Sequence, residues 1–97
     1  MDPHRESFAI SWSNEVAASR GRARPLVALE STLITHGLPW PTNIETARSA
    51  EREVRSAGAV PATIAVLNGR VCLGLEESDL EHLAGEGNRL EIGRAHV

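Results

Sequence analysis

The sequence predicts an α/β protein built on a mixed sheet, and three observations lead to that class. The apolar run 26–29 has the length and composition of a buried strand. Apolar residues then recur at intervals of three or four along residues 44–57, which is the pattern of an amphipathic helix. The mostly apolar segment 59–67 leads into Asn68-Gly69, the strongest short signal for a hairpin turn. A strand, a helix and a hairpin in this order combine parallel and antiparallel pairing in one sheet.

Two further helices are expected, one on each side of this segment. Ser13 or Asn14 can cap a short helix that ends in a loop at Gly21. A closing helix is expected over residues 78–83, with Leu80 on its apolar side. The predicted order of elements is therefore helix, strand, helix, strand, strand, helix, without an internal repeat.

The central helix has recognisable ends and two different sides. Pro39 and Pro41 hold the preceding segment in a loop, so Thr42 or Asn43 is expected to cap the helix. Gly58 supplies the left-handed residue at its end. The charged residues of this helix are expected on its solvent side, and they are Glu45, Arg48, Glu51, Arg52 and Arg55.

Composition and charge limit the classes of function. The 97 residues carry a formal charge of −3, and no basic patch suits a nucleic acid. No run approaches the ~20 apolar residues of a membrane span, and the first residues lack the pattern of a signal peptide. The single cysteine, Cys72, excludes an internal disulfide and agrees with a reducing, cytoplasmic environment. All ten basic residues are arginine, so the chain contains no lysine.

The segment 27–37 is the most informative one for function. The predicted strand ends at Glu30, and small hydroxyl residues follow directly, namely Ser31, Thr32 and Thr35. In an open α/β sheet, ligands bind in the crevice beyond the strand ends. A carboxylate at that place is suited to move a proton or to bind a polar substrate. The alternative is that Glu30 only caps the turn that follows the strand.

Three blocks of sequence resemble the amino-terminal part of the pseudouridine-5'-phosphate glycosidase family. They are VALESTLITHG over residues 27–37, GLPWPTNIETA over 37–47 and GAVPATIAVLNGRVCLGL over 58–75. The likeness extends from about residue 14 to about residue 88 in one register. It implies a mixed-sheet α/β/α sandwich, of which only the amino-terminal part is present in this chain.

The resemblance also divides the chain into three parts. Residues 1–11 show no periodic pattern and are expected to form a loose leader. Residues 12–90 are expected to be the amino-terminal part of the glycosidase domain. Residues 91–97 do not fit the family pattern. The segment 92–97 has the amino acids that a common sequencing-adapter tract encodes, so a foreign tail is expected there.

The resemblance implies reversible cleavage of the C–C glycosidic bond of pseudouridine 5'-phosphate, which gives uracil and ribose 5-phosphate. Members of the family are understood to hold the opened ribose as a Schiff base on a lysine while a glutamate moves the proton. Glu30 matches that proton-donor glutamate. Because the chain has no lysine, we expect it to be inactive on its own.

Further properties of a full-length enzyme are implied by the same resemblance. One is a divalent metal, manganese, held by an acidic motif further along the family sequence, so no metal ligand is assigned in this chain. Others are a small-molecule nucleotide substrate, a cytoplasmic location and a homo-oligomer in the form of a homotrimer. No substrate-binding residue is assigned. The competing hypothesis is a non-catalytic α/β binding or subunit-association module that keeps part of the fold without the chemistry.

Four other side chains have alternative interpretations. His36 has no second ligand at a recognisable spacing, so we expect it to order the Glu30 loop by hydrogen bonding rather than to bind a metal. Trp40 is a packing anchor or subunit contact, or else a platform on which a base stacks. Asn43 is a helix cap or a substrate contact. His82 is expected to face solvent.

Overall fold

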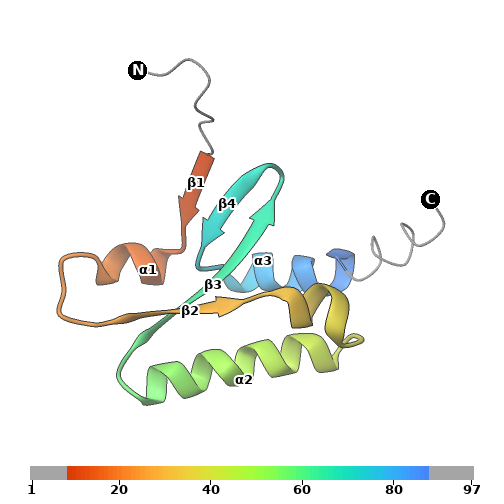
Figure 1. Ribbon diagram of the computed structural model, residues 1–97, viewed down its shortest axis with the longest axis horizontal. Helices are drawn as coiled ribbons and strands as arrows, with labels where there is room; N and C mark the ends of the chain where they lie inside the picture. The colour runs from red at the N-terminus through yellow and green to blue at the C-terminus, as the bar shows by residue number, and fades with distance from the viewer. Residues whose placement is uncertain (1–8, 88–97) are drawn as a thin grey trace.

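The computed structural model describes residues 9–87 of the chain (Figure 1). Residues 1–8 of the expected leader and the expected tail at 91–97 lie outside these residues. In chain order the elements are β1 (Ala9–Trp12), α1 (Asn14–Ser19), β2 (Leu26–Glu30), the π-helix η1 (Leu33–Gly37), α2 (Thr42–Ser56), β3 (Val60–Leu67), β4 (Arg70–Leu73), α3 (Glu77–His82) and the π-helix η2 (Leu83–Gly87).

The strands form one four-stranded mixed sheet, which confirms the predicted class. Their order in the sheet is β1-β4-β3-β2. β1 is parallel to β4, β2 is parallel to β3, and β3 and β4 form an antiparallel hairpin. β3 is the long central strand, since residues 60–64 pair with β2 and residues 64–67 pair with β4. Both outer strands, β1 and β2, have one strand neighbour each within the described sheet.

The main core lies between the sheet and the helices α2 and α3. It joins Ile44 of α2, Leu80 of α3 and Ala65 of β3, and Ile34 of η1 also belongs to it. Figure 1 shows α2 running alongside β2, while the β3–β4 hairpin extends away from α2. A second, smaller cluster is formed where Val16 of α1 packs against β3. Among residues 9–87, none of the helices has the length and apolar character needed to cross a membrane.

Several local predictions about helix ends and turns are confirmed. Ser13 caps α1, because its Oγ accepts a hydrogen bond from the backbone N–H of Val16 at 3.1 Å. Gly58 follows α2 with a φ of 88°. Asn68 and Gly69 have φ angles of 53° and 76°, which is the left-handed pair that a type I′ hairpin turn requires. The closing helix begins one residue earlier than expected and continues as η2.

The expectation of a loose leader is wrong for residues 9–11, because they belong to β1. The strand pairs in parallel with β4, and Ile10 lies opposite Val71 in the register. This partner is distant in the sequence. The pairing that makes these residues a strand is therefore not visible in their local sequence.

The strand expected at 26–29 exists as β2, but the expectation that it is buried is wrong. Leu26 is 47% exposed and Val27 is 36% exposed. The cause is the position of β2 at the edge of the sheet. Among the described strands it has one neighbour, β3, and its other side has none.

Two expectations about α2 are also corrected. The helix begins at Thr42 with Pro41 in the capping position, and no side chain caps it there. Neither Thr42 nor Asn43 is therefore the cap. Glu51, expected in solvent, is buried because its carboxylate accepts a hydrogen bond from Thr63 Oγ1 at 2.6 Å across the interface with β3.

Candidate functional site

Glu30 is the last residue of β2 and lies opposite Ile64 of the parallel neighbour β3. Its side chain is exposed. Within residues 9–87, the Glu30 carboxylate takes part in no hydrogen bond or ion pair. The structure therefore lends no support to the interpretation that Glu30 caps the following turn. The carboxylate is free to meet a ligand at the carboxyl end of β2.

The hydroxyl residues after Glu30 support the backbone of their own turn. The N–H of Ile34 donates to the carbonyl of Ser31 at 3.0 Å. Thr35 Oγ1 lies 3.5 Å from the carbonyl oxygens of Ser31 and Thr32, at the limit of a hydrogen bond. In the described part of the chain, none of these hydroxyls bonds to Glu30. Of the expected cluster of hydroxyls, that of Thr35 therefore contacts the backbone of its own turn, while Ser31 and Thr32 contribute their carbonyl groups.

A groove of about 280 Å³ opens beside Glu30, between β2, η1 and α2. Its walls are mostly apolar, and they are formed by Leu29, Glu30, Leu33, Ile34, Asn43, Thr46, Ala47, Ala50 and Thr63. A carboxylic acid beside an apolar surface loses part of its hydration when a ligand fills the space. The arrangement is therefore suited to an acid that hands a proton to a bound ligand.

Asn43 is the residue that fixes the shape of this groove. It is fully buried, and its Nδ2 donates to the carbonyl oxygens of Ile34 at 2.9 Å and Ala84 at 3.0 Å. Its Oδ1 accepts the backbone N–H of Ile44 at 2.8 Å. One side chain thereby joins η1, α2 and η2. The sequence interpretation as a cap or a substrate contact missed this role, because both carbonyl partners come from other elements.

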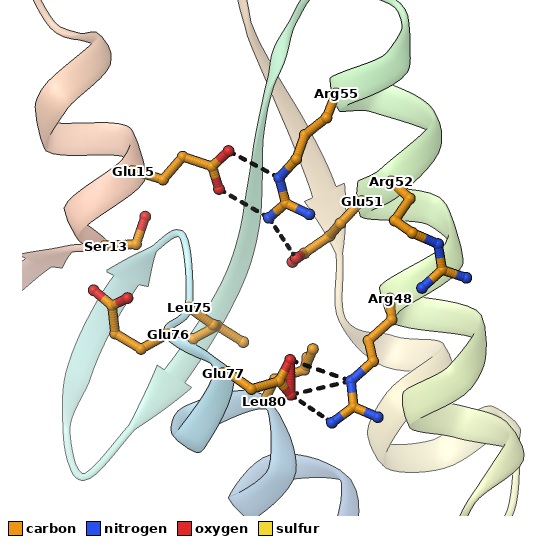
Figure 2. Close-up of a pocket in the computed structure, with 10 residues that line it drawn as sticks. All are labelled: Ser13, Glu15, Arg48, Glu51, Arg52, Arg55, Leu75, Glu76, Glu77 and Leu80. Atoms are coloured by element: carbon orange, nitrogen blue, oxygen red, sulfur yellow. Dashed lines mark hydrogen bonds and ion pairs between the residues drawn. The ribbon is translucent and has the colours of Figure 1, made fainter.

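A second cleft, of about 250 Å³, lies on the other side of α2 and is lined largely by charged side chains (Figure 2). Arg55 holds Glu15 of α1 through two hydrogen bonds of 2.8 Å and contacts Glu51 at 3.2 Å. Arg48 holds Glu77 of α3, with a shortest distance of 2.6 Å. Arg52 also lines this cleft, but Figure 2 shows no bond from it to the other residues drawn. The two bonded arginines therefore tie α1 and α3 to α2.

The ion pairs of this cleft shift the pKa values of their members. The hydrogen bonds from Arg55 lower the pKa of Glu15, and its positive charge acts in the same direction. The same bonds raise the pKa of Arg55, and contact with Glu51 adds to that effect. Bonding to Glu77 raises the pKa of Arg48. The cleft is occupied by its own charge pairs, which suits a structural link between helices.

The other side chains singled out in the sequence are dispersed. His36 belongs to η1, the turn that follows Glu30. Trp40 is 62% exposed in the loop before α2. His82 is exposed in the last turn of α3, as expected. Within residues 9–87, no three His, Cys, Asp or Glu side chains are grouped so as to hold a metal ion. These residues do not fit a manganese site.

The fold and the site together define a class of protein. An acid at the carboxyl end of a strand, beside an apolar groove in an α/β sheet, lies where ligands bind in proteins of this fold class. Residues 15–95 match the family described as indigoidine synthase A like protein, and the chain belongs to that family.

Curated relatives of this chain are named pseudouridine-5'-phosphate glycosidase, the family that the three blocks of sequence resemble. Pseudouridine-5'-phosphate glycosidase 1 of Rhizobium johnstonii is 55% identical over 88 residues, which are 91% of this chain and 28% of that protein. The pseudouridine-5'-phosphate glycosidase of Jannaschia sp. is 54% identical over 91 residues, which are 94% of this chain and 30% of that protein. The resemblance is thus confirmed, and this chain spans less than a third of the length of each relative.

Two solved structures share the fold. An indigoidine synthase A-like protein of Thermotoga maritima has a TM-score of 0.68 and 31% identity, and the match covers 89% of this chain and 27% of that one. The prealnumycin C-glycosynthase AlnA, in complex with ribulose 5-phosphate, has a TM-score of 0.63 and 42% identity, with 81% and 25% covered. The mixed α/β class is therefore confirmed by known structures.

Proposed function

We propose that this chain forms the proton-donor part of a pseudouridine-5'-phosphate glycosidase. The reaction is the reversible cleavage of the C–C glycosidic bond of pseudouridine 5'-phosphate, which gives uracil and ribose 5-phosphate. The observation that carries the proposal is Glu30, an unbonded carboxylate at the end of β2 beside the apolar groove. Support comes from the names of the relatives and from AlnA, a C-glycosynthase that binds a five-carbon sugar phosphate.

The chemistry assigns Glu30 its role. A C–C glycosidic bond has no oxygen on the leaving group, so the usual protonation of that oxygen by a glycosidase acid is not available. The proton must instead reach the carbon of the base that leaves, and a positioned carboxylic acid can supply it. An amine that forms a Schiff base with the opened sugar would divide the difficult step into two easier ones. With no lysine in its sequence, this chain requires that amine from another part of the family fold.

The proposal predicts different results for two proteins. The 97-residue chain alone should show no turnover, and borohydride with ribose 5-phosphate should leave no covalent adduct on its internal residues. A chimera in which the matched 88 residues of this chain replace their counterparts in the Rhizobium johnstonii relative should turn over pseudouridine 5'-phosphate. In the chimera, Glu30→Gln removes the proton but keeps the shape, so turnover should fall by roughly 10²–10⁴-fold.

The control is Glu53→Gln, which makes the same chemical change at an exposed position on α2. Turnover of this variant should equal that of the chimera. If Glu30→Gln behaves like Glu53→Gln, the proton donor is another group. An adduct on an internal residue of the isolated chain would also overturn the argument, because it would show a nucleophile among residues that include no lysine.

The absence of lysine also favours a second candidate, the non-catalytic association module. In that case the chimera would fold but show no turnover, and Glu30→Gln would have nothing to reduce. Circular dichroism of the chimera, recorded beside the turnover assay, distinguishes this result from a failure to fold.

A further inference from the structure

The Glu30 side chain is positioned by the backbone on either side of it. Within residues 9–87 its carboxylate has no hydrogen bond or ion pair, so no contact of its own fixes its direction. On one side lies β2, which ends at Glu30 and pairs with β3. On the other side Ser31 and Thr32 lead directly into η1. The position of η1 therefore determines how the carboxylate lies relative to the groove.

η1 contains a carbonyl group that its own backbone does not satisfy. In a π-helix the carbonyl of Ile34 would accept from the residue five positions later, which is Pro39, and proline has no N–H. The N–H of Leu38 donates instead to the carbonyl of Leu33 at 3.1 Å. Ile34 is only 3% exposed, so water is a poor substitute. The Ile34 carbonyl needs a donor from outside η1.

Asn43 supplies that donor and also ties η1 to two other elements. Its Nδ2 donates to the carbonyl of Ile34 at 2.9 Å and to that of Ala84 in η2 at 3.0 Å. Its Oδ1 accepts the N–H of Ile44 in α2 at 2.8 Å. Both Nδ2 hydrogens and the amide oxygen are thus in use, which only a side-chain amide of this length can achieve at this place.

We infer that Asn43 is a positioning residue for Glu30, because it holds the turn after the acid so that the carboxylate lies beside the groove. The inference rests on the proposed function, since it requires Glu30 to donate the proton. Asn43 is fully buried and acts through η1 rather than on the substrate. A misplacement of about 1 Å in a reacting group can cost about 10²-fold in rate, so a residue behind the acid can affect turnover strongly.

Asn43→Ala in the chimera tests the inference. Because the acid acts in the transition state, kcat should fall by roughly 10–10²-fold, whereas KM should change by less than about 3-fold. Asn43→Ser keeps one donor and can bond only one of the two carbonyls, so its kcat should lie between those of the parent and Asn43→Ala. It provides the same test if the alanine variant does not fold.

Val16→Ala is the matched control, because it also removes a fully buried side chain but at a distance from the acid. Val16 packs against Val60 and Ala62 of β3, whereas the groove is lined by Thr63 of the same strand. Successive side chains of a strand lie on opposite faces of the sheet. Val16→Ala should therefore lower the melting temperature, yet kcat measured well below that temperature should stay within about 2-fold of the parent.

A double variant shows whether Asn43 acts through Glu30. In the Glu30→Gln chimera the proton is already lost, so adding Asn43→Ala or Asn43→Ser should lower turnover by less than about 2-fold more. A purely structural residue would instead give losses that multiply. Multiplying losses would contradict the inference, and so would a kcat for Asn43→Ala equal to that of Val16→Ala.

Hydrogen exchange reports on the turn without any need for turnover. The N–H groups of Ile34 and Thr35 donate to the carbonyl of Ser31 at 3.0 and 3.3 Å. In the 97-residue chain, Asn43→Ala should speed the exchange of these two amides by about 10-fold or more relative to Val16→Ala. Equal exchange rates in the two variants would overturn the inference, because η1 would then keep its place without Asn43.

These measurements separate the positioning role from the proposed function. Turnover that depends on Glu30, together with equal kcat and exchange rates for Asn43→Ala and Val16→Ala, would contradict the positioning role alone. Turnover that is insensitive to Glu30→Gln would contradict the proposed function. Faster exchange of the Ile34 and Thr35 amides in Asn43→Ala would in that case still show that Asn43 holds the turn.

Discussion

Removing the Asn43 side chain should destabilise the protein more than any exposed substitution in α2. Asn43→Ala deletes two hydrogen bonds donated to the carbonyls of Ile34 and Ala84 and one accepted from the N–H of Ile44. The side chain is fully buried, so water does not replace it readily. At about 0.5–1.5 kcal/mol for each bond, the free energy of unfolding should fall by about 2–4 kcal/mol.

Urea unfolding of the 97-residue chain, followed by circular dichroism, measures this loss. The unfolding free energy of a small protein changes by about 1–3 kcal/mol for each molar step in urea, so the midpoint should move down by about 0.7–4 M. Thr42→Ala is the matched control, because Thr42 is the exposed neighbour at the start of α2 and caps nothing. Its midpoint should shift by less than about 0.5 M.

Asn43→Asp then identifies which bonds matter. Aspartate keeps the acceptor for Ile44 but loses both donors, and it places a charge in a buried position. The variant should be at least as unstable as Asn43→Ala at neutral pH. Equal midpoints for Asn43→Ala and Thr42→Ala would refute the reasoning, since they would mean that the three elements hold together without this side chain.

Two further predictions concern the contacts around α1. Because Arg55 lowers the pKa of Glu15 in the folded chain, the pair stabilises the fold above the ordinary range of a glutamate. That stabilisation should be lost as the pH falls below about 4, and Glu15→Gln should flatten the acid limb of the unfolding free energy. Gly74→Ala should lower stability by about 2–4 kcal/mol, because a Cβ there would meet Ser13 Oγ and Val16 Cγ2 at a φ of 91°. Gly58→Ala is its control, with a φ of 88° and open space around it, and it should cost only about 1 kcal/mol. Similar losses for Gly74→Ala and Gly58→Ala would show that the close approach to α1 is unimportant.

Local signals were enough to predict most of the element boundaries. The pair Asn68-Gly69 and the single Gly58 have left-handed backbones because the turn and the helix end require them, and both requirements act within a few residues. Ser13 caps α1 through a bond to Val16, three residues away. Predictions succeeded where the partner lies within one turn of the chain.

The features that were missed depend on partners distant in the sequence. β1 is held by β4, about sixty residues further along the chain. Glu51 lies among charged residues in the sequence, which is typical of the solvent side of a helix. Its carboxylate nevertheless accepts a hydrogen bond from Thr63 of β3 and is buried between α2 and β3. The apolar run of β2 has the composition of a buried strand, but its position at the edge of the sheet leaves Leu26 exposed. No periodicity within one element contains this information.

The candidate site shows the same division between local and distant causes. The sequence placed Glu30 at the end of a strand, and the groove beside it adds Leu29 and Leu33 as apolar walls. An apolar environment that excludes water strengthens the interaction between an acid and a polar ligand. The described residues provide one wall of such an environment and leave the Glu30 carboxylate exposed. The position of the acid is encoded locally at the end of β2, whereas the groove beside it also needs residues of η1, α2 and β3, which the sequence of the strand does not specify.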